Sequence, residues 1–275
     1  MYFSMDEIGF KNTEKIKSIA SEADRWQFIY NVAKSYGFVG IHITPSLYKN
    51  EFWLDINNIP DYFQDFKLTL HFGGLHNHTA DRDAFDIALA QCFEIATKNN
   101  MHDISLHPCQ SVYGLSEDEK KSIYEIFHKT IDKWLSIALK STFSLSLETH
   151  VSGKYFLFNG LNDFVKFIDH YPDLGVLIDV SHNYYDGYSE DEIIKFLANK
   201  NVKGLHISDA LQKSKGASFE TGTHAAVGNG SVDFDKVLKG FAHIPNLYSA
   251  LEIKASNEGV ARSLKLLHEV HQRII

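Results

Sequence analysis

The chain alternates between short apolar runs and longer stretches in which apolar residues recur every three or four positions. Short apolar runs bounded by polar residues predict strands, and the wider spacing predicts amphipathic helices. The expected helices cover residues 83–100, 119–140, 161–170 and 189–199. A weak first strand is expected within residues 1–9, and the others at 38–43, 66–72, 103–108, 143–148, 174–180, 202–207 and 247–253.

This alternation predicts an α/β fold of the (β/α)8 TIM barrel type. Eight strand–helix repeats in 275 residues are the usual content of such a barrel. A doubly wound open sheet is the alternative, because it is built from the same unit. No glycine-rich phosphate loop follows the first strand, which counts against that alternative. Without a linker-like or low-complexity stretch, we expect one domain over residues 1–275.

The predicted strands end in polar side chains, although a lone buried carboxylate is costly. In "LSLETH", residues 145–150, apolar positions alternate up to Glu148, and the same pattern recurs on five other predicted strands. In a TIM barrel the carboxyl ends of all strands share one mouth, where the active site lies. We therefore expect seven side chains to converge there: His71, His107, Glu148, Asp179, His182, His206 and Glu252.

A bound cation would explain this convergence, because crowded Asp, Glu and His side chains otherwise repel or desolvate one another. Two glutamates, one aspartate and one histidine suit a divalent ion (Mn, Mg, Co or Zn) with positions left open for substrate oxygens. For any one of these residues, a hydrogen-bonded role at the strand–loop junction is the alternative. Glu148, Asp179 and Glu252, together with one of the histidines, are therefore candidate ligands of one divalent ion.

Charge and cysteine content narrow the partners. The net charge is −8 and only four residues are arginine, so the sequence shows no basic patch for gripping phosphate backbones. Nucleic acid is therefore disfavoured as a partner but not excluded. Two cysteines cannot form a disulfide framework, and neither a signal peptide nor a membrane span is recognisable. A cytoplasmic protein is therefore expected, and the sequence leaves open whether it forms a homo-oligomer.

From about residue 38 to its end, the sequence resembles the xylose-isomerase-like barrel superfamily, which includes sugar isomerases, epimerases and endonuclease IV. The isomerase and epimerase branch holds one metal with residues that follow strands five to eight. His182 matches a substrate-contacting histidine of the family, and "GNGSVDF" (228–234) resembles its glycine loop, with Asn229 where glutamate is common. The four metal positions correspond here to Glu148 in "LSLETH", Asp179 in "LIDVSH", His206 in "LHISD" and Glu252 in "ALEIK".

Endonuclease IV, a DNA-repair phosphodiesterase, uses the same four residues and adds ligands for two further zinc ions. "LHPCQS" and "IDVSHNYYDGY" resemble its motifs. Its third zinc needs an aspartate two residues before the last histidine, and here that position is Gly222. The resemblance implies additional ligands at His71, His107, His182 and His224.

The first function implied by the resemblance is a metal-dependent isomerase or epimerase of a sugar or sugar-like polyol. Glu148 and Glu252 would be the catalytic acid and base around a metal-stabilised enediolate. Ketohexose epimerases carry an arginine after the strand-seven histidine, whereas this loop has Lys213 and Lys215, which suit a phosphate or carboxylate. An endonuclease IV-like zinc phosphodiesterase is the alternative, and a binding protein without turnover is the third.

Several other side chains keep two interpretations. Cys109 is either a nucleophile or a small loop residue. His150 either orients a metal ligand or contacts substrate, and Asp209 takes one of the same two roles. His42 either packs at the rim or binds metal. Two loop histidines either reach the mouth or lie in solvent: His76 and His78.

Overall fold

Eight parallel strands close into a barrel, which confirms the (β/α)8 prediction and excludes the open sheet. Each strand pairs with the next along the chain, and β8 pairs with β1. The computed structural model describes residues 1–6, 18–44, 56–73, 82–110, 114–213, 216, 218–254 and 256–274. The strands are β1 (Tyr2–Asp6), β2 (Gly40–Ile43), β3 (Lys67–Phe72), β4 (Asp103–Leu106), β5 (Ser144–Glu148), β6 (Gly175–Asp179), β7 (Val202–Ile207) and β8 (Tyr248–Leu251).

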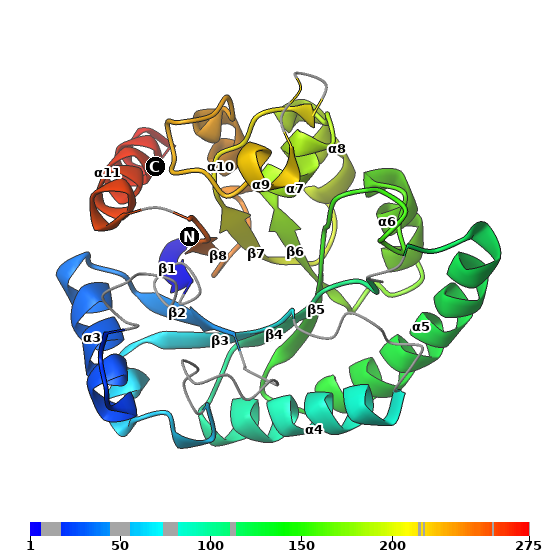
Figure 1. The fold of residues 1–275 in the computed structure, drawn as a ribbon, viewed down its shortest axis with the longest axis horizontal. Coiled ribbons are helices and arrows are strands. Elements are labelled where there is room, and N and C mark those ends of the chain that lie inside the picture. The colour runs from blue at the N-terminus through cyan, green and yellow to red at the C-terminus, as the bar shows by residue number, and fades with distance from the viewer. Residues whose placement is uncertain are drawn as a thin grey trace.

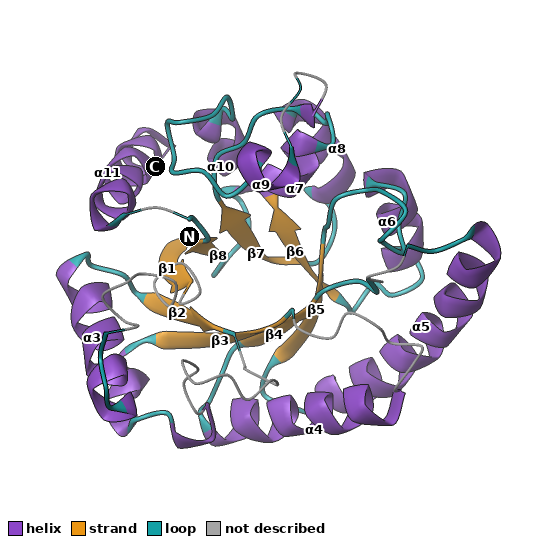
Figure 2. Ribbon diagram, viewed as in Figure 1, coloured by secondary structure: helices purple, strands orange, loops and turns teal. Residues whose placement is uncertain are grey.

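Helices surround the barrel (Figures 1 and 2). Four of them match the predicted helices. Ser189 is the N-cap of α8, as the sequence suggested, and its hydroxyl accepts from the Glu192 N–H in a capping box. The helices are α3 (Glu22–Ser35), α4 (Arg82–Lys98), α5 (Glu117–Ala138), α6 (Leu161–Ile168), α7 (Val180–Tyr185), α8 (Glu190–Leu197), α9 (Phe219–Gly222), α10 (Phe234–Phe241) and α11 (Asn257–Ile274), with short 3-10 turns at η1 (Ile56–Asn58) and η2 (Asp61–Asp65).

The two faces of each strand have different chemistry, because successive side chains point to opposite sides of a sheet. In β5, Leu145 and Leu147 belong to the large apolar cluster that the strands share with the helices. Ser146 and Glu148 alternate with these two leucines along the strand, and they are also buried but polar. The barrel interior is therefore lined by polar residues, and this inner face leads to the mouth.

A network at the amino-terminal end of the strands closes the barrel floor. Tyr248 on β8 donates a 2.9 Å hydrogen bond to Asp103 on β4, across the interior. Ser144 and Ser146 donate to the other oxygen of Asp103, at 2.5 and 2.7 Å. Gly204 makes room for the tyrosine, since a Cβ there would lie 2.2 Å from the Tyr248 ring. The floor is thus tied together by side chains, and the site lies at the opposite end.

Some sequence predictions fall outside the described residues, namely those for His76, His78 and Lys215. Among the helices that are described, none is both long and apolar enough to cross a membrane.

Candidate metal centre

Glu148, the last residue of β5, lies in the middle of the predicted cluster. Its Oε1 is 3.1 Å from Nδ1 of His206. Its Oε2 is 2.8 Å from Nε2 of His107 and 3.4 Å from Nε2 of His71. The carboxylate is fully buried, so each of its oxygens faces protein nitrogen rather than water.

The first ligand group contains the four residues predicted to bind one metal. Nδ1 of His206 lies 2.8 Å from Oε2 of Glu252 and 3.8 Å from Oδ2 of Asp179. One ligand atom from each residue lies within 4.8 Å of the others. The strand-end spacing in the sequence therefore places these four side chains together: Glu148, Asp179, His206 and Glu252.

Two further groups lie beside the first and share a carboxylate with it. His71 and His107 approach each other to 2.8 Å between their Nε2 atoms, and they form the second group with Glu148. Asp179, His182 and His224 form the third group. The structure thus brings together the four histidines that the resemblance implied as additional ligands: His71, His107, His182 and His224.

Asp179 divides its two oxygens between the fold and the centre. Oδ1 caps the short helix α7 by accepting from the backbone N–H of His182 at 2.7 Å and from Ser181 Oγ at 2.9 Å. Oδ2 takes no part in the cap and lies 3.4 Å from Nδ1 of His182. The cap turns the chain so that the histidine three residues later faces the aspartate that holds the helix.

Several buried polar atoms of these groups have no hydrogen-bond partner among the described residues. They include Oε2 of Glu148, Oδ2 of Asp179, Oε2 of Glu252 and both ring nitrogens of His182. Oε2 of Glu148 is close to histidine nitrogens, but their geometry is not that of a hydrogen bond. Because buried polar atoms are normally satisfied, this pattern fits divalent cations between the facing oxygens and nitrogens.

Neighbouring histidines lower the pKa values of the two glutamates in the first ligand group. Burial alone would raise the pKa of Glu148, but the surrounding histidines, His107 first, hold that pKa well below its usual value. Burial would likewise raise the pKa of Glu252, and His206 and His224 outweigh it and hold the pKa low. Both glutamates are therefore ionised at neutral pH, which is the form that binds cations.

The histidines differ in protonation. Burial lowers the pKa of His71 to about 3 and also lowers the pKa of His182, so both rings are neutral. For His206, burial lowers the pKa, but Glu252 and Glu148 outweigh it and the pKa lies well above its usual value. The pKa of His107 is raised by Glu148 against burial. Metal binding would have to displace the protons of these last two rings.

Asp209 supports a loop rather than joining a ligand group. Its Oδ1 accepts from the N–H groups of Ala210 and Val232, at 2.9 and 3.1 Å, and its Oδ2 accepts from the N–H of Gly228 at 2.9 Å. These bonds hold the glycine loop 228–234 against the end of β7. We therefore interpret Asp209 as the anchor of that loop, and its predicted substrate or ligand contact stays a prediction.

His150 and Cys109 lie near the mouth with different character. Nδ1 of His150 accepts from the backbone N–H of Val151 at 3.0 Å, so its proton is on Nε2. The centroid of its ring lies 4.6 Å from the ring centroid of His182 and 5.1 Å from that of His107. The thiol of Cys109 is 3% exposed and burial raises its pKa well above the usual value, which favours the packing role.

His42, whose role the sequence left open, lies directly against the centre. It is fully buried at the penultimate position of β2, and its Nε2 is 3.0 Å from Nε2 of His206. The available signal was its position, because His71 and His206 occupy the same penultimate place in β3 and β7.

Comparison with known proteins identifies the family of this barrel. The family described as "Xylose isomerase-like TIM barrel" matches residues 21–270. The chain belongs to this family. A sequence search among curated proteins finds no match to this chain.

Solved structures share the fold at low sequence identity. A D-tagatose 3-epimerase-like protein superposes with a TM-score of 0.74 and 17% identity, covering 100% of this chain and 98% of the other. The IOLI protein with a bound zinc atom gives a TM-score of 0.71 and 14% identity over 100% and 98%. Endonuclease IV from Thermus thermophilus gives 0.65 and 15% over 99% and 100%. At these identities the likeness shows the fold alone, and the xylose isomerase-like barrel hosts several chemistries.

Proposed function

We propose that this protein is a hydrolase of phosphate esters whose centre holds at least two divalent ions. The observation that carries the proposal is the environment of Glu148: Oε1 faces His206 and the first ligand group, whereas Oε2 faces His71 and His107. A carboxylate between two ligand groups is typical of two-metal sites, which phosphatases and nucleases use for in-line displacement at phosphorus.

The third ligand group supports the same proposal. Asp179, His182 and His224 offer three ligand atoms within 4.8 Å of one another. Gly222 supplies no fourth ligand in place of the aspartate found in endonuclease IV. Three protein ligands with one open position are typical of catalytic rather than structural metal sites. The departure at Gly222 is therefore compatible with a third ion that binds water or substrate.

The chain's own residues would hold and orient the substrate. Divalent ions in these groups would polarise a phosphoryl oxygen and lower the pKa of an attacking water. In this proposal Glu148 is a ligand, because neither of its oxygens is free to carry a proton to substrate. His150 presents an Nε2–H donor next to His107 and His182, where it can donate to a substrate oxygen.

The charge of the chain favours a small substrate. Binding a nucleic-acid backbone usually requires several Lys or Arg contacts to phosphates. This chain has a net charge of −8 and four arginines, and two of these, Arg262 and Arg273, hydrogen-bond Asn229 and Asp235. We therefore propose a small phosphate ester or diester as the substrate, with abasic DNA as the polymeric alternative.

A metal-dependent sugar isomerase or epimerase is the second candidate. It is favoured by the complete four-residue group around His206 and by the likeness to an epimerase-like structure. Here Glu148 and Glu252 would both hold the ion and exchange protons with adjacent or identical carbons of the substrate. Both are ionised, as a general base requires. This candidate needs one ion and gives His71 and His107 no ligand role.

The metal content of a His107→Asn variant separates the two candidates. The proteins are purified without chelator, and divalent ions per chain are counted by elemental analysis. His243→Asn is the matched control, because His243 is exposed and far from the ligand groups. The hydrolase proposal expects two or three ions in the wild type and the control, one fewer in His107→Asn, and loss of bis(p-nitrophenyl) phosphate hydrolysis in that variant.

One ion per chain, unchanged by His107→Asn, would overturn the hydrolase proposal. The isomerase would then be tested by incorporation of deuterium from solvent into a panel of ketoses and aldoses. If hydrolysis is found, comparison of small diesters with abasic DNA identifies the substrate class.

A further inference from the structure

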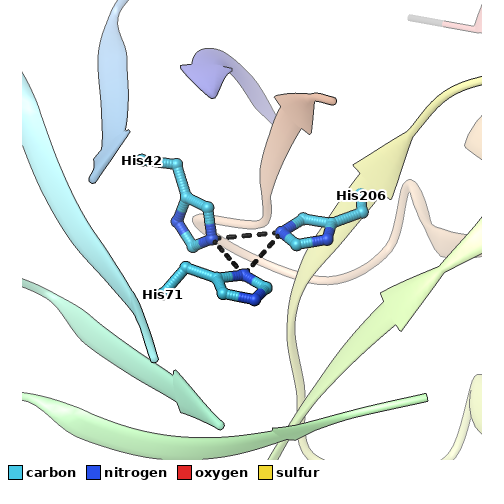
Figure 3. A group of neighbouring side chains, drawn as sticks. All are labelled: His42, His71 and His206. Carbon is cyan, nitrogen blue, oxygen red and sulfur yellow. Dashed lines mark hydrogen bonds between the residues drawn. The ribbon is translucent and has the colours of Figure 1, made fainter. Parts of the chain in front are cut away.

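His42 contacts two ligand histidines that belong to different groups (Figure 3). Its Nε2 lies 3.2 Å from Nδ1 of His71 and 3.0 Å from Nε2 of His206. The other two nitrogens, Nδ1 of His71 and Nε2 of His206, are 3.4 Å apart. All three side chains are 3% exposed or less, so water does not compete for these contacts.

The nitrogens that meet at His42 are the outer ones of each ligand histidine. Nε2 of His71 faces Glu148 and His107, and Nδ1 of His206 faces Glu148 and Glu252. Each ring thus presents one nitrogen to the centre and the other to His42. The His42 imidazole therefore contacts the outer nitrogen of His206, from the first group, and the outer nitrogen of His71, from the second group.

The pattern of protons follows from this geometry. A neutral histidine that binds a divalent ion through one nitrogen carries its proton on the other. The protons of His71 and His206 then lie on the two nitrogens that face His42, whose Nε2 must accept both. The proton of His42 is consequently on Nδ1, which lies 2.6 Å from Oγ1 of Thr69 and can donate to it. Every donor in the group then has an acceptor.

A metal ion shared by the three histidines is the competing interpretation, since their ligand atoms are close enough. That ion would be fully buried without a carboxylate ligand, which leaves its charge uncompensated. It would also require His71 and His206 to give up both protons, because their inner nitrogens face the other groups. Hydrogen bonding explains the contacts without either cost.

We propose that His42 is a positioning residue that fixes the proton position and ring orientation of His71 and His206 and so links two metal positions. The inference rests on the proposed centre with at least two ions, because it requires His71 and His206 to bind different ions. Because one acceptor serves both rings, its loss affects both metal positions at once. Groups behind metal ligands commonly contribute about 10–100-fold to metal affinity.

The test measures metal binding directly in variants of His42 and Thr69. Zinc affinity is determined by competition with a chromophoric chelator, and the visible spectrum of the cobalt-loaded protein reports ligand geometry. His42→Phe keeps a ring but removes the acceptor, and we expect about 10–100-fold weaker binding at two positions with an altered cobalt spectrum. His42→Gln restores a side-chain acceptor and should recover part of the affinity.

Thr69 provides an independent pair of variants. Thr69→Val is nearly isosteric but cannot accept the Nδ1 proton of His42, whereas Thr69→Ser keeps the hydroxyl. We expect weaker zinc binding and a changed cobalt spectrum in Thr69→Val and near wild-type behaviour in Thr69→Ser. If His42→Phe does not fold, this pair decides the question by the same two measurements.

The outcomes separate the two proposals. A wild type that binds fewer than two divalent ions overturns the proposed centre and this inference together. A wild type that binds ions, with His42→Phe and Thr69→Val unchanged from it, overturns only the role of His42. Loss of one ion in His42→Phe, with the remaining affinities unchanged, identifies His42 as a ligand and also overturns its positioning role.

Discussion

Replacing Glu148 by glutamine removes one negative charge from the centre and keeps the shape of the side chain. A pair of unit charges about 4 Å apart contributes about 4 kcal/mol at an effective dielectric constant of about 20. That energy corresponds to about a thousandfold in affinity, at about 1.4 kcal/mol per tenfold. Direct ligation and a doubly charged ion increase the effect, and the desolvation cost of the buried carboxylate reduces it, so about a thousandfold is the expected scale for each ion that Glu148 holds.

The number of affected ions distinguishes Glu148 from Glu252. Glu148 belongs to two ligand groups and Glu252 to one. We expect Glu148→Gln to weaken two metal positions by about a thousandfold, and Glu252→Gln to weaken one. The measurement is zinc titration of the metal-free proteins against a competing chelator, with Glu125→Gln on the exposed face of α5 as the control. Equal numbers of weakened positions in the two variants would refute the shared role of Glu148.

Three further predictions concern the rest of the barrel. Cys92 and Cys109 are buried with raised thiol pKa values, so thiol reagents should label neither in the native protein and both after unfolding; native labelling of Cys109 would contradict its packing role. Burial raises the pKa of Asp103 above 3.8, so the folded state keeps this proton to higher pH, and stability falls as pH rises from about 4 toward the raised folded pKa. Denaturant unfolding should show a flatter pH dependence over that window in Asp103→Asn, and an unchanged slope would contradict the raised pKa. Gly204→Ala should lower the free energy of unfolding by about 1–3 kcal/mol, because the added Cβ meets the Tyr248 ring. Tyr248→Leu in the same chain should relieve that cost, and additive effects in the double variant would argue against the clash.

The strands were predictable because their outer faces are apolar. Met5, Ile41 and Leu145 pack against the helices and give each strand its apolar run. The boundaries differ by a few residues, as for the strand expected at 38–43, which spans Gly40–Ile43. Five helices have no counterpart among the predicted ones, namely α3, α7, α9, α10 and α11. Only α7 and α9, with six and four residues, are too short to show helical periodicity.

The candidate site was predictable only as a set of residues. Strand-end position places Glu148 and Asp179 at one rim, because all carboxyl ends of a parallel barrel meet there. The use of each oxygen was not predictable. Asp179 gives Oδ1 to the cap of α7, and Glu148 turns its two oxygens to different groups, and both facts depend on side-chain rotation in the folded chain. His42 was left with two roles because its penultimate place on the strand does not show which groups its ring contacts in the folded chain.

The difference between the two candidate functions therefore lies in one oxygen atom rather than in the ligand residues. An isomerase and a phosphoesterase of this family can share the set around His206, so that set alone does not separate them. An acid–base glutamate must keep an oxygen available to substrate, whereas a bridging ligand must not. In this chain Oε2 of Glu148 is buried and faces His71 and His107, and His42 in turn contacts the outer nitrogen of His71. A single-ion isomerase has no need of this second layer of histidines, and it is the presence of that layer that favours the multinuclear proposal.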